Sequence, residues 1–232
     1  RATRPQHMYQ WDFTPVLANS GLLAAGLGNT LKLTATALAF GVPLGLGLAL
    51  LRLSGLRTLS MPAGFIVEFF RTTPPLVQLF WFFFALPILI QVEMTPFVAA
   101  ALTFSIQSAA FFAEVFRAGI VSIDRGQSEA ARALGMTGAQ AMRRVILPQA
   151  VKRMIPAFME RSIELMKTTT LVATVSYADL LFQANEVAQK TFRPLEVFTV
   201  TALIYFTVIY AASVVVHHIE RRLAVSGETT VH

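Results

Sequence analysis

Residues 152–176 carry ionisable side chains in an otherwise apolar stretch, and their spacing places them on one helical face. The positions i, i+4, i+7, i+8 and i+11 of that face are Glu160, Glu164, Lys167, Thr168 and Leu171. An ionised side chain inside a membrane costs about 2.5–3.5 kcal/mol on insertion scales, so this face must point into the protein or toward water. We expect the four polar side chains to line a pathway for a solute with ammonium and carboxylate groups.

The same charges allow a simpler alternative. Glu160 and Arg161 then lie at the cytoplasmic end of the helix, where water solvates both. Glu164 and Lys167 are spaced to pair with each other at i, i+3, whereas Glu160 and Glu164 repel. Arg161 is interpreted as a structural or surface charge rather than as part of the pathway.

Neutral polar side chains occur in two other apolar stretches. Gln107 and Ser108 either join the pathway or hydrogen-bond a neighbouring helix, and we include Gln107 in the pathway. Residues 71–75 (RTTPP) place two prolines at the start of another apolar run. Proline removes backbone hydrogen bonds, which a membrane tolerates only beside protein or a water-filled cavity. A helix start at Pro74 is favoured over a kink beside the pathway.

Several kinds of chemistry are excluded by what the chain lacks. It has no cysteine, and its four histidines, at positions 7, 217, 218 and 232, lie near the ends. Neither a G-x-x-x-x-G-K-[ST] phosphate loop nor a G-x-S-x-G nucleophile turn occurs. We therefore expect no catalytic residue, no metal and no cofactor bound by this chain, which excludes a membrane-embedded enzyme. Energy for transport must come from a partner or from a gradient.

The composition indicates a membrane protein. Of 232 residues, 55% are hydrophobic and only 14% charged, with a mean hydropathy of +0.60, whereas soluble domains carry roughly 25% charged residues. The formal net charge is +6, but the basic residues lie between long apolar runs, as in membrane loops. We therefore expect a lipid bilayer around the chain and no nucleic-acid partner.

Uncharged runs locate the spans, because about 20 apolar residues cross the hydrocarbon. Four are clear, at 33–51, 72–92, 94–113 and 197–216. The loop 114–153 holds seven Lys and Arg, and the C-terminal tail is also basic, so both are expected in the cytoplasm. Two crossings must separate them, and residues 152–176 supply the missing one. The predicted fold is all-α: a polytopic membrane bundle of five transmembrane helices, N-terminus outside and C-terminus inside.

The long cytoplasmic loop is too polar to enter the bilayer, yet its pattern predicts two short helices. Residues 127–134 (QSEAARAL) are good helix formers, and Gly135 stands where a helix end favours left-handed backbone. Thr137 and Gln140 form a capping box that starts a second helix. Leu147-Pro148 is expected to end that helix.

The knob formed by these two helices has two interpretations. It is either a solvated connector or a docking element, and small residues let another backbone come close. Such residues are frequent here: Ala130, Ala131, Ala133, Ala139 and Ala141.

Sequence motifs in the loop favour the docking element over the solvated connector. The run Glu129-Ala130-Ala131, Gly135 and, after nine residues, Val145-Ile146-Leu147-Pro148 resembles the EAA motif of permease subunits in ABC importers. Val145 stands where that family usually has Ile. GLGNTLKLT (26–34), FFRTTPPLVQLF (69–80), EVFRAGI (114–120) and TFRPLEVF (191–198) are similar to its polar amino acid branch, the histidine/glutamine/glutamate type. The likeness extends from about residue 21 to 223, and MYQWDF (8–13) is similar to the glutamate/aspartate subgroup.

The resemblance implies a set of partners and roles. A permease of this type moves polar amino acids across the bacterial inner membrane as a multi-pass protein. Its partners are two copies of a cytoplasmic ATPase, which bind ATP and Mg, a second permease subunit, identical or paralogous, and a periplasmic solute-binding protein. The ATPase-coupling residues implied are Glu129, Ala130, Ala131, Arg132, Gly135 and Pro148. Many relatives have Asp or Asn where Thr168 stands, so the substrate stays open.

The resemblance also implies a division of the chain. Residues 1–19 are expected to form a periplasmic segment, with residues 1–7 an upstream or engineered extension before Met8. Residues 20–223 form the transmembrane domain, with the coupling loop at 120–148, and residues 224–232 a cytoplasmic tail. The alternative function is a self-sufficient channel or secondary transporter, but no inverted repeat is found and the knob has no role in it.

Overall fold

The computed structural model describes residues 9–224, and all regular elements in that range are helical. They are α1 (Thr14–Ala18), α2 (Ser20–Leu53), α3 (Arg57–Thr72), α4 (Pro75–Phe80), η1 (Trp81–Ala85), α5 (Leu86–Ile90), α6 (Pro96–Val121), α7 (Arg125–Ala133), α8 (Gly138–Ala141), η2 (Met142–Ile146), α9 (Leu147–Thr168), η3 (Thr169–Val175), α10 (Leu180–Thr191) and α11 (Pro194–Ala224). The all-α prediction is confirmed for the described residues. The predicted extension at 1–7 lies outside them, and so does the predicted tail at 224–232, except for Ala224, which is the last residue of α11.

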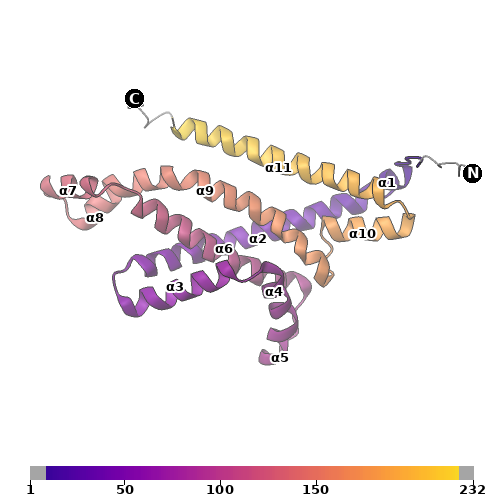
Figure 1. Cartoon of the computed structure of the whole chain (residues 1–232), viewed down its shortest axis with the longest axis horizontal. Coiled ribbons are helices and arrows are strands. Elements are labelled where there is room, and N and C mark those ends of the chain that lie inside the picture. The colour runs from indigo at the N-terminus through magenta and orange to yellow at the C-terminus, as the bar shows by residue number, and fades with distance from the viewer. Residues whose placement is uncertain (1–8, 225–232) are drawn as a thin grey trace, which may run out of the picture.

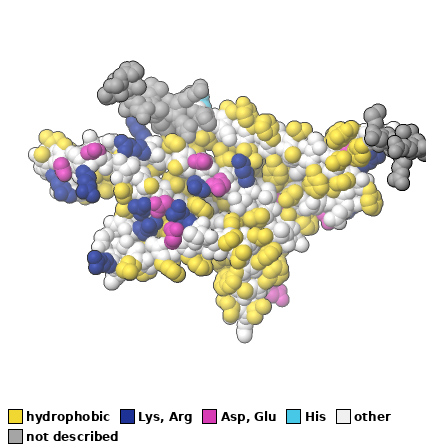
Figure 2. All heavy atoms as spheres, in the orientation of Figure 1, with side chains coloured by type: hydrophobic (Ala, Val, Ile, Leu, Met, Phe, Trp, Pro, Cys, Tyr) yellow, Lys and Arg dark blue, Asp and Glu magenta, His cyan; other side chains and the backbone are white. Residues whose placement is uncertain are grey.

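The helices form an elongated bundle with two distinct ends (Figure 1). The α2–α3 connection, the α7–α8 knob and the last turns of α11 lie toward one end, whereas α1 and α10 lie at the other. The segment from α4 to α5 leaves the bundle as an arm. Lys and Arg side chains on the visible face gather over the knob and the neighbouring half of the bundle, while the arm and the other half are mainly hydrophobic (Figure 2).

Among the described residues, three helices are long and apolar enough to cross a bilayer: α2, α6 and the Pro194–Val216 part of α11. A fourth crossing results if α3 and the segment Pro75–Ile90, which meet at 104°, count as one. The span predicted at 72–92 corresponds to the second member of this pair, and its crossing stays a prediction. The first member, α3, begins at Arg57, and the chain turns after it, where two prolines lack N–H groups.

The count of five spans stays a prediction. Residues 152–176, expected as a crossing, fall in α9 and η3, and α9 carries too many charges to qualify by composition. In Figure 1 α9 nevertheless runs back from the knob toward α10, along α6 and α2. Its neighbours supply the packing that a charged helix needs inside a membrane.

The α2–α6 contact is the main packing interface, and small residues allow it. A side chain at Gly41 would meet the Ser108 Cβ at 2.7 Å, and one at Gly45 would meet the Ala109 carbonyl oxygen at 2.8 Å. Helices in lipid associate by close van der Waals packing rather than by exclusion of water. These two glycines thereby bring the backbone of α2 against the middle of α6.

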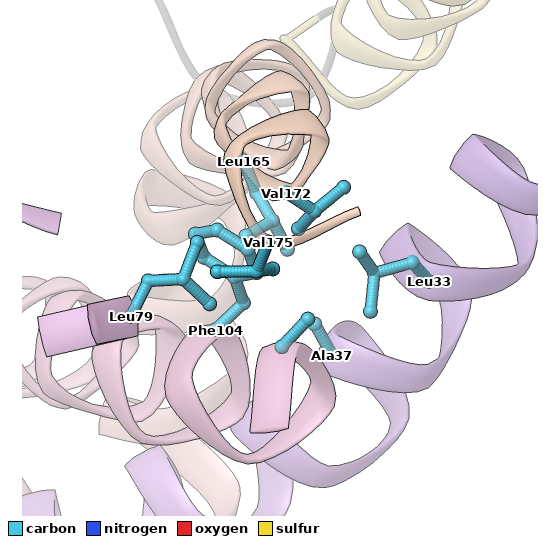
Figure 3. Close-up of a cluster of buried hydrophobic side chains, with 8 residues drawn as sticks. Leu33, Ala37, Leu79, Phe104, Leu165, Val172 and Val175 are labelled. Atoms are coloured by element: carbon cyan, nitrogen blue, oxygen red, sulfur yellow. The ribbon is translucent and has the colours of Figure 1, made fainter. Parts of the chain in front are cut away.

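Apolar side chains from five helical segments meet beside this interface (Figure 3). The fully buried members from α2, α4, α6 and η3 include Leu33, Leu79, Phe104 and Val172. Leu165 of α9 joins the same cluster. The cluster fixes α9 and the start of the arm against α2 and α6.

The break between α3 and α4 is stabilised by one side chain. Pro74 and Pro75 have no N–H to donate to the carbonyls one turn earlier. The buried amide of Gln78 replaces the donor that Pro74 lacks, since its Nε2 donates to the Phe70 carbonyl at 3.0 Å, and it also donates to the Thr73 carbonyl at 2.9 Å. The helix start favoured from sequence at Pro74 is confirmed within one residue, because α4 begins at Pro75.

The knob matches its predicted pattern in two respects and differs in one. Gly135 has a φ of +77°, and the reciprocal capping box of Thr137 and Gln140 is present at the start of α8. The predicted helix end at Leu147-Pro148 is wrong. The π-helical turn η2 leads directly into α9, so the helix continues through Pro148. A π turn changes the local hydrogen-bond pattern and accommodates a residue without an N–H.

Candidate solute cavity and coupling loop

A cavity of about 250 Å³ opens where the α3–α4 break faces the middle of α6 and the second half of α9. Its lining residues are Arg71, Thr73, Pro75, Gln107, Ser108, Phe111, Phe112, Arg161, Glu164, Leu165 and Thr168. Irregular backbone at membrane depth is tolerated only where it is covered by protein or lines a water-filled space. The cavity therefore explains how the irregular backbone between α3 and α4 is tolerated in the membrane.

The cavity brings together three of the five residues predicted for the pathway. Gln107, which is 5% exposed, Glu164 and Thr168 all line it. Glu160 and Lys167 do not line it and are exposed elsewhere on α9. A helical face defined by i+4 and i+7 spacing is wide, and α6 covers only part of it.

The pairing predicted between Glu164 and Lys167 is not formed. Glu164 accepts a hydrogen bond from the Arg161 guanidinium, three residues earlier on the same helix. A planar guanidinium matches a carboxylate better than an ammonium does. Arg161, interpreted from the sequence as a structural or surface charge, has its side chain on the cavity wall.

Sequence reasoning missed two arginines, Arg71 and Arg161, that converge on one aromatic ring. Their guanidinium carbons lie 5.9 and 4.7 Å from the centre of the Phe111 ring. A ring face attracts cations and holds their orientation. One indication in the sequence pointed to Arg71, which directly precedes the helix-breaking Thr-Thr-Pro-Pro run. Nothing in the sequence indicated that Phe111 of α6 contacts both arginines.

Two buried donors in the cavity wall have no partner among the described residues. They are the Nε of Arg71 and the hydroxyl of Ser108. The terminal nitrogen of Arg71 contacts Glu68 at 3.5 Å; Glu68 is largely exposed and is not one of the residues that line the cavity. A buried donor without a partner is costly, so both groups are available to a solute.

The end of the bundle with α10 contains a separate buried carboxylate. Asp179 is fully buried and its Oδ1 accepts the Phe182 N–H at 2.8 Å as the N-cap of α10. Burial raises the pKa of this carboxyl to about 6. Thr30 of α2 accepts the Leu180 N–H at 3.1 Å and ties the same turn to the long helix.

The six predicted coupling residues lie in the knob or at its exit. Glu129, Ala130 and Arg132 are exposed on α7, whereas Ala131 is buried against the rest of the knob. Gly135 and Pro148 are exposed. The alanine pair is therefore split, with Ala130 presented outward and Ala131 used for internal packing.

No group of three His, Cys, Asp or Glu side chains that would hold an ion occurs among the described residues.

Apolar helices of membrane-spanning length, a polar cavity halfway along them and a helical knob at one end define a multi-pass membrane transport protein. The chain belongs to the family described as binding-protein-dependent transport system inner membrane component, which matches residues 41–225.

Relatives and a solved structure agree with this family. The chain is 36% identical to the glutamate/aspartate import permease protein GltK of Escherichia coli O6:H1, covering 94% of this chain and all of that one. It is 34% identical to the arginine transport system permease protein ArtQ of Bacillus subtilis, over 91% and 97%. A crystal structure of an amino acid ABC transporter with histidines is similar, with a TM-score of 0.88, 37% identity and coverage of 92% and 100%.

Proposed function

We propose that this chain is the permease subunit of an ATP-driven importer that moves polar amino acids across the bacterial inner membrane. Its relatives are permeases of amino acid importers, and one structural observation supports the assignment most strongly. A cavity of amino-acid size is lined by α9, a helix that continues without interruption from a knob suited to a partner. Gln107, Glu164 and Thr168 form the solute pathway together with the residues around them.

The helix from the knob to the cavity provides the mechanical coupling. α8, η2 and α9 follow one another without a gap, so one helical rod joins Gly138 to Thr168. Pro148 and Arg161 are about 20 Å apart along such a rod. A displacement of the knob therefore moves one wall of the cavity, while α6 and α2 hold the opposite wall through their close contact.

The partners follow from the family and from the chain's own deficits. The chain has no phosphate-binding loop, so a separate pair of cytoplasmic ATPases binds ATP and Mg and docks on the knob. A second permease subunit, identical or paralogous, completes the pathway, and a periplasmic solute-binding protein delivers the amino acid. Lipid covers helices such as α11, whose apolar stretch within Pro194–Val216 is only 6% buried by the rest of the chain.

The coupling residues are Glu129, Ala130, Ala131, Arg132, Gly135 and Pro148. Ala130 is the position where docking is tested with least effect on the fold, because its side chain is exposed and small. Arginine at this position blocks close approach of another backbone but disturbs no internal contact. Gln189→Arg adds the same side chain at an exposed position on α10, at the opposite end of the bundle.

The test is co-purification of the ATPase with each variant from detergent-solubilised native membranes. We expect Ala130→Arg to lose both the ATPase and amino acid uptake, and Gln189→Arg to keep both. Deletion of residues 125–148 provides a second test against a channel or secondary transporter. If uptake survives the loss of the knob, the ATP-driven importer is refuted.

A further inference from the structure

We propose that the cavity selects amino acids with two carboxylates, with Arg71 and Arg161 each binding one carboxylate and Glu164 binding the ammonium. The inference rests on the proposed function and specifies its substrate. Similarity alone does not rank the candidates, because relatives named for glutamate/aspartate, glutamine and arginine are 36%, 37% and 34% identical. The charges in the cavity distinguish among them.

The ionisable side chains that line the cavity have a net positive charge. Two arginines and one glutamate line the cavity, which gives a net charge of 2 − 1 = +1. An acidic amino acid carries −1 and neutralises it, a neutral amino acid leaves one cation uncompensated, and a basic one adds to the excess. Uncompensated charges in a partly desolvated site are costly. The exposed Lys167 and Glu160 lie outside the cavity and do not change this balance.

The available donors fit two carboxylates. The Nε of Arg71 is buried and unpartnered among the described residues, and the Ser108 hydroxyl, on the wall of the same cavity, is a second such donor. These groups form one anion site on the α3 and α6 side. Arg161 donates to Glu164 and keeps further N–H groups for a second anion. Both guanidinium groups lie over the ring of Phe111, at 5.9 and 4.7 Å from its centre, which brings the two proposed carboxylate sites into one cavity.

Glu164 completes the set as the acceptor for the ammonium group. Its side chain is 56% exposed, so the pair with Arg161 does not bury it. The cavity volume of about 250 Å³ corresponds to about eight water molecules. Glutamate, with about ten non-hydrogen atoms, fills that space, whereas a peptide does not fit.

Glutamate and glutamine form a matched pair of ligands, because they differ only in charge at one end. The experiment measures their binding to the purified permease–ATPase complex in lipid nanodiscs, without the binding protein, by ligand-observed NMR at millimolar concentrations. We expect wild type to favour glutamate by about 10- to 150-fold, the value of one charge-assisted hydrogen bond.

Three variants separate the roles. Arg161→Gln is expected to abolish or reverse the preference for glutamate, while Arg161→Lys keeps part of it. In this proposal Arg71 binds the α-carboxylate and Arg161 the side-chain carboxylate, so Arg71→Gln weakens glutamate and glutamine alike. Arg57→Gln removes an exposed arginine at the start of α3, away from the cavity lining, and leaves both affinities unchanged.

Three results would contradict selection of amino acids with two carboxylates and leave the proposed importer function intact. A complex that contains the ATPase and imports an amino acid, but binds glutamine as well as glutamate, contradicts it. Retention of the preference in Arg161→Gln contradicts it as well, and so does absence of saturable glutamate binding. Loss of the ATPase from wild-type complex instead refutes the importer itself.

Discussion

Replacement of Gln78 by methionine tests the helix break that forms one wall of the cavity. Met has nearly the same length and is apolar, so the change removes the two donated hydrogen bonds and little packing. The Phe70 and Thr73 carbonyls, now 3.0 and 2.9 Å from Gln78 Nε2, then lose their partner. The Oε1 of Gln78 is unpartnered among the described residues, so the donors account for the amide's contribution.

The expected cost follows from those two bonds. Both hydrogen bonds are part-buried, and one such bond contributes about 0.5–1.5 kcal/mol, so the loss of two costs about 1–3 kcal/mol. For a chain of this size, 1 kcal/mol shifts the melting temperature by about 2–4 °C, and the variant should melt at least about 2 °C below wild type. Amide exchange should also accelerate around the break, because the chain there opens more often.

The assay is thermal unfolding of the detergent-purified protein, followed by tryptophan fluorescence, together with hydrogen exchange of residues 69–80. Gln189→Met is the control, since it makes the same chemical change at an exposed position of α10. Equal melting temperatures and equal exchange at residues 69–80 for Gln78→Met and wild type would refute the role assigned to Gln78.

Three further changes test other parts of the fold. Because the Asp179 pKa is raised from 3.8 to about 6 by burial, folding takes up a proton between these values, and stability should fall by about 3 kcal/mol as pH rises through that window. Asp179→Asn keeps the N-cap acceptor, so its unfolding should lack this pH dependence and it should be more stable than wild type at pH 8; a wild-type curve flat between pH 4 and 6 would contradict this. Gly45→Ala should cost about 1–3 kcal/mol by forcing α2 from the Ala109 carbonyl, whereas Gly47→Ala, with open space around it, should be neutral or slightly stabilising; equal melting temperatures would disprove the close contact. Gly135→Ala, at a φ of +77°, should destabilise the knob by about 1–2 kcal/mol, seen as faster amide exchange in α7 and α8, and unchanged exchange would rule out a need for glycine there.

Local rules predicted the parts of the fold that depend on near neighbours in sequence. The capping box of Thr137 and Gln140 and the left-handed Gly135 are set within a few residues, and both are present. The exit at Pro148 depended on a π turn, which has no simple sequence pattern, and was therefore mispredicted.

The candidate site was only partly predictable for a different reason. Periodicity identified the face of α9 with Glu164 and Thr168. Spacing along one helix does not tell which part of a face meets a neighbour, so Glu160 and Lys167 were included although they lie outside the cavity. Arg71 joins the site only because the chain turns by 104° after α3, which is a tertiary fact.

The most direct measurement is the composition of the complex that contains this chain in its native membranes. Mild-detergent extraction, affinity purification and quantitative mass spectrometry give the ratio of each partner to the permease. We expect one copy of an ATPase per permease subunit, with a second permease in the same particle. Recovery of the folded chain alone, without an ATPase, would contradict it.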